Sequence, residues 1–191
     1  MKKLLSLTTF CLLSILLVMG CKPNVKGGVS HIYGTMESKQ WDGKKIFLVP
    51  MFGPQDAAHV DSVVIKDGKF EFTADSTELK IIRLDYHFRQ GTQELLVVSE
   101  PGNVKVFIGR NSMTAGTPQN DSLQVWKVAV TKYNETYNQL RAEASKEGSD
   151  QLLLTKGKEI QKSLREFTGK MADRQPEGVL KKFLKLQAGR R

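Results

Sequence analysis

The spacing of apolar residues changes once along the chain, and this change constrains the fold more than any other feature. Before Gly116, short runs place apolar residues at every second position, which is the pattern of half-buried strands. After Pro118, apolar residues recur every three or four positions, as on one face of an amphipathic helix. The sequence therefore predicts an antiparallel β-sandwich or barrel followed by a helical region.

The clearest strand signal surrounds Asp67 and Gly68. An Asp-Gly pair supplies the positive φ angles that a two-residue type I′ turn requires, and Phe70 and Phe72 follow it at alternate positions. Further short strands with turn residues between them are predicted at 32–36, 45–49, 79–86, 94–99 and 104–108. This number of short strands favours a sandwich or barrel.

Two apolar stripes predict two helices in the second half of the chain. The first stripe comprises Leu123, Trp126, Val130, Tyr133, Tyr137, Leu140 and Ala144, and the second comprises Leu153, Ile160, Leu164, Phe167 and Met171. Asn120 or Asp121 is the expected N-cap of the first helix. A short polar loop between the stripes predicts an antiparallel helical hairpin, and a third short helix is expected at 179–186.

Residues 1–20 have the three parts of an export signal: two N-terminal lysines, an apolar run and the small residue Gly20 at the cleavage point. The sequence Val18-Met19-Gly20-Cys21 resembles a lipobox, in which lipid is attached to the cysteine sulfur and the chain is cut just before it. We therefore expect a lipoprotein held on a membrane through Cys21. An uncleaved N-terminal anchor helix is the alternative.

The expected domains are a signal peptide at 1–20, a flexible tether at 21–28, a β domain at 29–118 and a helical region at 119–187. We expect a cell-envelope location, on the periplasmic face or the cell surface. The outer membrane is favoured because Lys22 is not an acidic signal for retention at the inner membrane. The chain contains only the cysteines Cys11 and Cys21, so a lipidated mature chain would have no thiol for redox chemistry.

The net positive charge of the chain is concentrated in its second half. Residues 119–191 contain 15 Lys and Arg against 9 Asp and Glu, whereas residues 22–118 contain 12 against 11. Such a basic region can face anionic lipid or an acidic surface, and an ordinary solvated helical face is the alternative. No nucleic-acid-binding motif is present, and we expect no nucleic-acid partner.

No catalytic or metal-binding constellation is recognisable. His31, His59 and His87 are far apart and have no ligand at helical or turn spacing, so we expect neither a metal nor another cofactor. No nucleophile motif such as G-x-S-x-G occurs. We predict a protein that is not an enzyme. Trp41 and Phe52, in predicted loops, are candidates for stacking against a ligand such as a sugar, with core packing as the alternative.

Several segments together resemble a known domain. They are Ile32-Tyr33-Gly34, the turn from Asp61-Ser62 to Glu71-Phe72, Glu100-Pro101-Gly102, and Gly116 to Asp121. In this order they resemble the N-terminal β domain of Gram-negative lipoproteins related to thiol:disulfide interchange proteins, a domain-of-unknown-function family with the number 4369. The resemblance runs from Val29 to the helices near Tyr137.

The resemblance implies a helical linker and then a thioredoxin-like or AhpC/TSA-like domain, whose C-x-x-C carries out the redox chemistry. No cysteine follows Cys21 here, so that activity cannot be transferred. We expect a naturally short member or a gene truncated after the linker. The predicted function is a non-enzymatic binding or scaffolding role toward a protein, peptide or glycan. The alternative is an accessory subunit that positions a separate thioredoxin-like partner.

Overall fold

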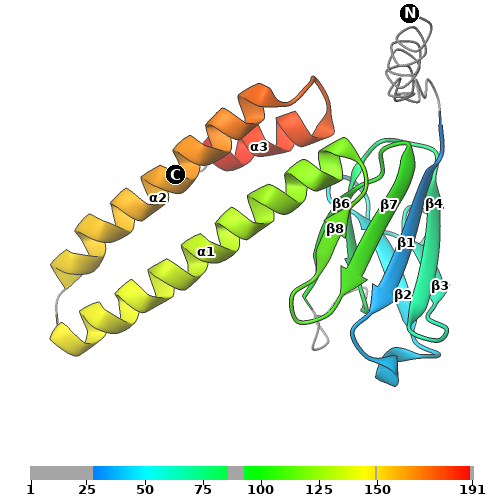
Figure 1. The fold of residues 1–191 in the computed structure, drawn as a ribbon, viewed down its shortest axis with the longest axis horizontal. Helices are drawn as coiled ribbons and strands as arrows, with labels where there is room; N and C mark the ends of the chain where they lie inside the picture. Colours follow the sequence, from blue (N-terminus) through cyan, green and yellow to red (C-terminus); the bar gives the residue numbers. More distant parts are fainter. Residues whose placement is uncertain (1–27, 86–92, 149, 190–191) are drawn as a thin grey trace, which may run out of the picture.

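The chain folds into a two-sheet β-sandwich followed by three helices, as Figure 1 shows for the computed structural model. The structure describes residues 28–85, 93–148 and 150–189. The strands are β1 (Ser30–Met36), β2 (Lys45–Pro50), β3 (Asp61–Val64), β4 (Lys69–Ala74), β5 (Leu79–Arg83), β6 (Leu95–Val98), β7 (Gly102–Ile108) and β8 (Met113–Ala115). A short 3-10 helix, η1 (Lys39–Trp41), follows β1, and the α-helices are α1 (Pro118–Glu147), α2 (Asp150–Arg174) and α3 (Val179–Gly189).

The strands form two sheets of four. Sheet A has the order β4-β1-β7-β8, and sheet B has the order β3-β2-β5-β6. Their inward side chains, including Ile32, Phe72, Leu48 and Ile82, form one apolar core between the sheets. This confirms the predicted sandwich. Every second residue of a strand points inward, and the burial of these side chains between the sheets stabilises the fold.

One strand pair differs from the antiparallel expectation. The strands β1 and β7 run parallel, with Ile32 opposite Val104. Between β1 and β7 the chain forms the four strands of sheet B and also β4, which pairs antiparallel with the other side of β1. β1 and β7 are thus joined by a long crossover, which two parallel neighbouring strands require. The short edge strand β8 was also not anticipated.

The turn at Asp67 and Gly68 has the predicted conformation, with φ angles of 52° and 68°. The two strands that flank the turn do not continue to pair with each other. Lys66 and Lys69 exchange two 2.9 Å backbone hydrogen bonds, after which β3 pairs with β2 in sheet B and β4 pairs with β1 in sheet A. The turn therefore connects the two layers of the sandwich rather than two paired strands of one sheet.

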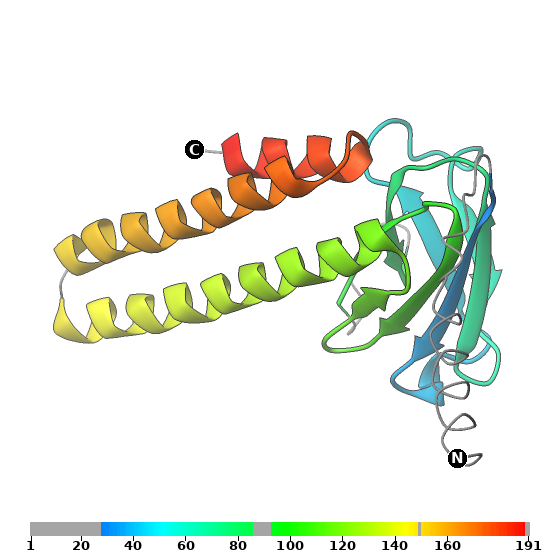
Figure 2. The same cartoon turned by 45° about the horizontal axis from the view of Figure 1, so that its top comes forward.

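The helices form the predicted hairpin and a third helix that packs beside it. Figure 2 shows α1 and α2 running side by side away from the sandwich, with α3 against the part of α2 nearest the sandwich. On the first stripe, Leu123, Leu140 and Ala144 are buried and the central residues are half-buried. On the second stripe, Phe167 is 39% exposed, whereas the adjacent Thr168 is buried.

The predicted N-cap is wrong by three or four positions. Thr117 occupies the N-cap position, and Pro118 is the first helical residue. Proline is favoured there because its missing N–H would have no intrahelical partner. Asn120 and Asp121 therefore lie inside α1, and Asn120 is fully buried.

A second apolar core joins the helices to the outer face of sheet B. It combines Leu79 and Val98 of the sheet with residues from all three helices: Leu123, Met171, Ala172, Leu180, Phe183 and Leu184. These contacts fix the position of α1 against the sandwich. Within the described segments, no helix is both long and apolar enough to cross a membrane.

Candidate binding groove

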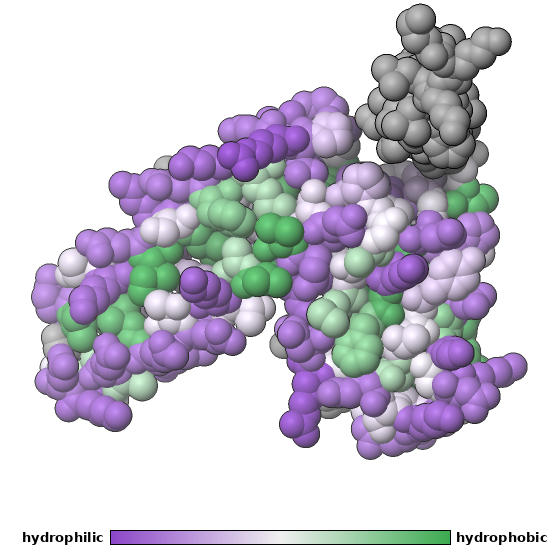
Figure 3. Space-filling model, viewed as in Figure 1, coloured by the Kyte–Doolittle hydropathy of each residue, from purple (hydrophilic) through white to green (hydrophobic). Residues whose placement is uncertain are grey.

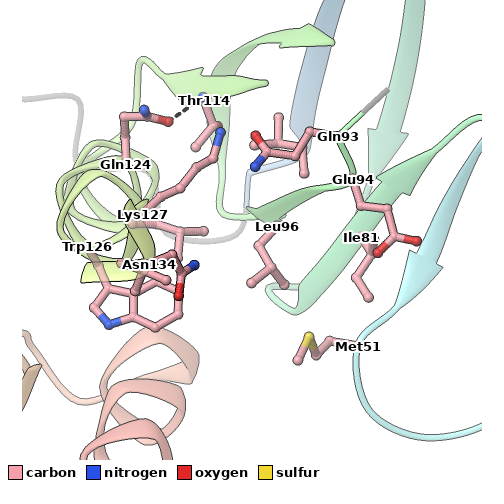
Figure 4. A pocket seen from close by; sticks show the side chains of 13 residues that line it. Met51, Ile81, Gln93, Glu94, Leu96, Thr114, Gln124, Trp126, Lys127 and Asn134 are labelled. Atoms are coloured by element: carbon pink, nitrogen blue, oxygen red, sulfur yellow. Dashed lines mark hydrogen bonds between the residues drawn. The ribbon is translucent and has the colours of Figure 1, made fainter. Parts of the chain in front are cut away.

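A groove of about 630 Å³ lies between α1 and the outer face of sheet B. Figure 4 shows the side chains that surround it. Sheet B and its flanking loops contribute Met51, Ile81, Gln93, Glu94, Leu95 and Leu96, β8 of sheet A contributes Thr114, and α1 contributes Leu123, Gln124, Trp126, Lys127, Val130 and Asn134. The volume is in the range of sites that bind small molecules or peptide segments.

The walls of the groove are largely apolar. Ile81 and Leu96 come from adjacent strands of sheet B, and Trp126 and Val130 lie one helical turn apart on α1. All four are half-buried rather than fully buried, because the second core covers only part of the sheet face. Figure 3 shows apolar surface along the helices, next to the sandwich.

Two buried polar contacts position α1 beside the groove. The Asn120 side chain accepts a 2.9 Å hydrogen bond from the N–H of Val98 and donates one of 2.8 Å to its C=O. The Glu100 carboxylate accepts bonds of 2.7 and 3.2 Å from the N–H groups of Gln119 and Asn120. A carboxylate at these first-turn N–H groups also opposes the positive end of the helix dipole. The start of α1 is thus fastened to the edge of sheet B.

Trp126 connects the groove wall to the other helices. Its indole Nε1 donates a 3.2 Å hydrogen bond to Oγ1 of Thr168 on α2. Its ring meets the edge of Phe183 on α3, with centroids 5.0 Å apart. Trp126, which the sequence places on the first apolar stripe, therefore packs between the helices, although it also lines the groove.

The charged residue that α1 contributes to the groove is Lys127. Burial lowers the pKa of Lys127, and its Nζ donates a 3.3 Å hydrogen bond to Oδ1 of Asn111. Glu94 also lines the groove, but it forms a 3.5 Å ion pair with Arg83. Among the described residues, no carboxylate forms an ion pair with Lys127. The groove therefore has an unneutralised positive charge beside an apolar floor.

The residues predicted to bind a ligand are not brought together. Trp41, in η1, is partly buried against the sandwich core. Phe52 follows β2, is 57% exposed, and lines a separate 170 Å³ cavity with Leu186 and other residues of α3. Gly20 and Cys21, predicted for signal cleavage and lipid attachment, lie outside the described residues.

The histidines are also separate from one another. His31 stacks on Tyr33 on the exposed face of sheet A, with ring centroids 6.3 Å apart. His59 lies 2.6 Å from Asp56, and His87 lies outside the described residues. Within the part of the chain that the structure describes, no group of three or more His, Cys, Asp or Glu residues could hold a metal ion.

The sequence alone did not identify Lys127 or Leu96 as site residues. In the sequence, the feature that could have pointed to Lys127 as a site residue is its position directly after Trp126 of the apolar stripe. In the sequence it resembles any solvated helical lysine. The position of Leu96 on the rim depends on how far the helices cover sheet B, which is a long-range property.

Comparison with known families gives one match, and it covers the sandwich and the start of α1. Residues 30–123 match the DUF4369 family model, described as a domain of unknown function. The matched range includes the sheet side of the groove and Asn120, but Trp126, Lys127 and Val130 lie beyond it. Searches of curated proteins and of solved structures found no match for the chain.

Proposed function

We propose that this chain is a lipid-anchored cell-envelope protein with a non-enzymatic binding role, and that the groove between α1 and sheet B contacts a partner protein. The groove supports the proposal because it combines half-buried apolar walls with the unneutralised Lys127. Sites that bind ligands characteristically have apolar walls and a few polar groups that fix orientation. This combination is the observation that carries the proposal.

The membrane anchor rests on the sequence around Cys21. An apolar stretch ending in Val18-Met19-Gly20-Cys21 is typical of a lipoprotein signal, and stable attachment requires more than one acyl chain. We propose an outer-membrane location, with the chain facing the periplasm or the exterior. Cells fed an alkyne fatty acid should label the wild-type chain but not the Cys21→Ser variant. An unlabelled wild-type chain would refute the anchor.

The groove can be tested with two matched substitutions on α1. Val130 lines the groove, whereas Val125 is 56% exposed and lies about 140° around the helix. We expect Val130→Glu to abolish chemical crosslinking to the partner in intact cells, because a carboxylate would be placed in the apolar wall. Val125→Glu should preserve it. Equal crosslinking by the two folded variants would contradict the proposed site.

The alternative partner is a separate thioredoxin-like protein. The resemblance of the β domain to modules that adjoin such domains favours this reading. In that case the crosslinked protein would contain a C-x-x-C domain. A complex formed only with proteins lacking such a domain would exclude the accessory role.

A glycan ligand would use Trp41 or Phe52. Because these side chains lie in different parts of the fold, one saccharide ring could not stack on both. Glycan-array binding that is lost in Trp41→Ala or Phe52→Ala would favour this reading over the protein partner.

A further inference from the structure

The exposed face of α3 combines two lysines with a large apolar side chain. Residues of α3 that face the second core, such as Phe183, are buried, whereas Lys182, Lys185 and Leu186 are exposed. At 3.6 residues per turn, these three exposed residues lie within about 100° of one another around the helix. They therefore form one continuous strip of surface on the side of α3 that points away from the core.

A second exposed apolar side chain lies beside this strip. Phe52, in the loop after β2, and Leu186 are each 57% exposed. Both line the 170 Å³ cavity described above, together with Lys182. Single apolar residues are common on protein surfaces, but a group of them beside polar residues marks an interaction surface. We call Phe52, Lys182, Lys185 and Leu186 the α3 patch.

The neighbouring carboxylates do not pair with the lysines of the α3 patch. Glu177 forms a 2.7 Å ion pair with Lys181. Glu78, which also lines the cavity, lies 3.5 Å from Nζ of Lys80. Among the described residues, neither lysine of the patch forms an ion pair. The patch thus presents two positive charges beside apolar side chains, which is the composition of surfaces that adsorb to anionic phospholipid.

The chain enters the sandwich at the same end of the molecule. In Figure 2, α3 and the loop after β2 lie along the upper side, and β1 begins at the upper right. The C=O of Val29, just before β1, accepts a 3.2 Å hydrogen bond from the N–H of Gly102. In the same turn, Glu100 binds the N–H of Gln119, whose Oε1 accepts a 3.3 Å bond from the N–H of Leu180 in α3. These contacts connect the start of β1 to the start of α3.

The length of chain before Val29 limits how far this end of the molecule can lie from the membrane. Seven peptide units separate Cys21 from Gly28, the first residue that the structure describes. A segment of this length spans at most about 25 Å when fully extended. A lipid on Cys21 would therefore hold the end that carries the α3 patch close to the bilayer. At such a high local concentration, weak adsorption is sufficient to keep the patch on the lipid.

We propose that the α3 patch lies on the anionic phospholipid bilayer to which Cys21 is anchored. Phe52 and Leu186 enter the headgroup region, and the two lysines of the patch contact lipid phosphates. This proposal rests on the lipid anchor proposed above and adds the orientation of the chain on its membrane. No residue lines both the cavity of the patch and the groove between α1 and sheet B, so the membrane surface and the partner surface are separate.

The test uses the full chain in nanodiscs of mixed phosphatidylcholine and phosphatidylglycerol. A photoreactive amino acid at Leu186 should crosslink to phospholipid, whereas the same amino acid at Leu154 should not. Leu154 is a matched control because it is 54% exposed but lies near the start of α2, at the end of the hairpin far from the sandwich. Circular dichroism should show that both labelled chains keep the wild-type fold.

Removing the charge of the patch should weaken the contact. Each lysine near an anionic bilayer strengthens adsorption about fivefold. Lys182→Gln combined with Lys185→Gln should therefore lower lipid crosslinking at Leu186 by at least about fivefold. Lys156→Gln combined with Lys158→Gln, at exposed positions of α2, removes the same charge and should leave the yield unchanged. Nanodiscs of phosphatidylcholine alone should give a yield as low as that of the first pair of substitutions.

The proposal is overturned if Leu186 and Leu154 give equal lipid crosslinking, or if the yield depends neither on phosphatidylglycerol nor on the two lysines of the patch. A crosslink from Leu186 to a protein and not to lipid in intact cells would also overturn it. The fraction of chain that co-purifies with the nanodiscs is measured separately. A chain that co-purifies without the crosslink keeps its anchor and loses only the proposed orientation, whereas a chain that does not co-purify refutes both.

Discussion

Both backbone polar groups of Val98 are bound by the side chain of Asn120, with distances of 2.9 Å from N to Oδ1 and 2.8 Å from Nδ2 to O. One side chain thus substitutes for a neighbouring strand at the edge of sheet B. The same side chain accepts a 3.2 Å bond from Oγ1 of Thr114 in β8 and donates one of 2.8 Å to Oγ1 of Thr117. Asn120 therefore connects the edges of both sheets to the first turn of α1.

Asn120→Ala should be strongly destabilising. It leaves the buried N–H and C=O of Val98 without partners, and each such group costs about 1–3 kcal/mol. We expect the free energy of unfolding, measured by urea denaturation, to fall by about 2–4 kcal/mol. The exposed Asn138→Ala, in the same helix, should change it by less than about 0.5 kcal/mol. Equal stability of the two variants would show that the contact between Asn120 and Val98 does not stabilise the position of α1.

Glu100→Gln tests the contribution of charge to the start of α1. The amide oxygen can still accept bonds from the N–H groups of Gln119 and Asn120, but the amide NH2 cannot accept the 3.2 Å bond from Nε2 of Gln119, and the negative charge at the start of the helix is lost. Because Glu100 is only 8% exposed, we expect a loss of about 1 kcal/mol in the free energy of unfolding. Glu100→Ala should cost more, since the N–H groups then lose their acceptor. A Gln variant as unstable as the Ala variant would show that the bonds from the two backbone N–H groups do not contribute to stability.

The contact between Trp126 and Thr168 can be measured by a double-mutant cycle. Thr168→Val preserves the shape of the buried side chain and removes the acceptor of the indole N–H. We expect it to lower the free energy of unfolding by about 1 kcal/mol. In Trp126→Phe, the same Thr168→Val change should cost less, with a coupling energy of about 0.5–1 kcal/mol. Additive effects would mean that the hydrogen bond contributes nothing to stability.

Glu177 provides a pH-dependent prediction. A side-chain hydrogen bond from Lys181, and then the charge of the same residue, lower the pKa of Glu177; the two groups are 2.7 Å apart. Because the folded-state pKa is depressed, the pair contributes stability above the unfolded-state pKa and loses it as the pH falls through the folded-state pKa. In Lys181→Met, an NMR titration should show the Glu177 pKa rising, whereas Lys158→Met should leave it unchanged. An unchanged pKa in Lys181→Met would rule out the pair in solution.

The features that the sequence predicted correctly depend on neighbouring residues. The turn at Asp67 and Gly68 follows from the positive φ angles that this dipeptide tolerates, and the alternation of Phe70 and Phe72 identifies the buried face of β4. The helical hairpin follows from the spacing of apolar residues and a short loop. None of these inferences requires knowledge of which distant segments meet.

The features that it missed depend on long-range contacts. The parallel pairing of β1 with β7 requires the path of the chain through sheet B. Asn120 is a residue type that is common at N-caps, but its side chain binds Val98, 22 residues earlier. It lies inside α1 rather than at its N-cap. On α2, Thr168 rather than Phe167 is buried, and its hydroxyl accepts the indole N–H of Trp126. The groove itself exists because the helices cover only part of sheet B.

Site-specific photocrosslinking in living cells tests the binding role of the groove most directly. A photoreactive amino acid at Asn134, which lines the groove, should yield a discrete crosslinked protein. The same amino acid at Val125, on the opposite side of α1, should not. We expect the Asn134 product to disappear when Val130→Glu is added to the same chain. A product of equal yield at both positions, or one that persists with Val130→Glu, would contradict the assignment of the groove as the binding surface.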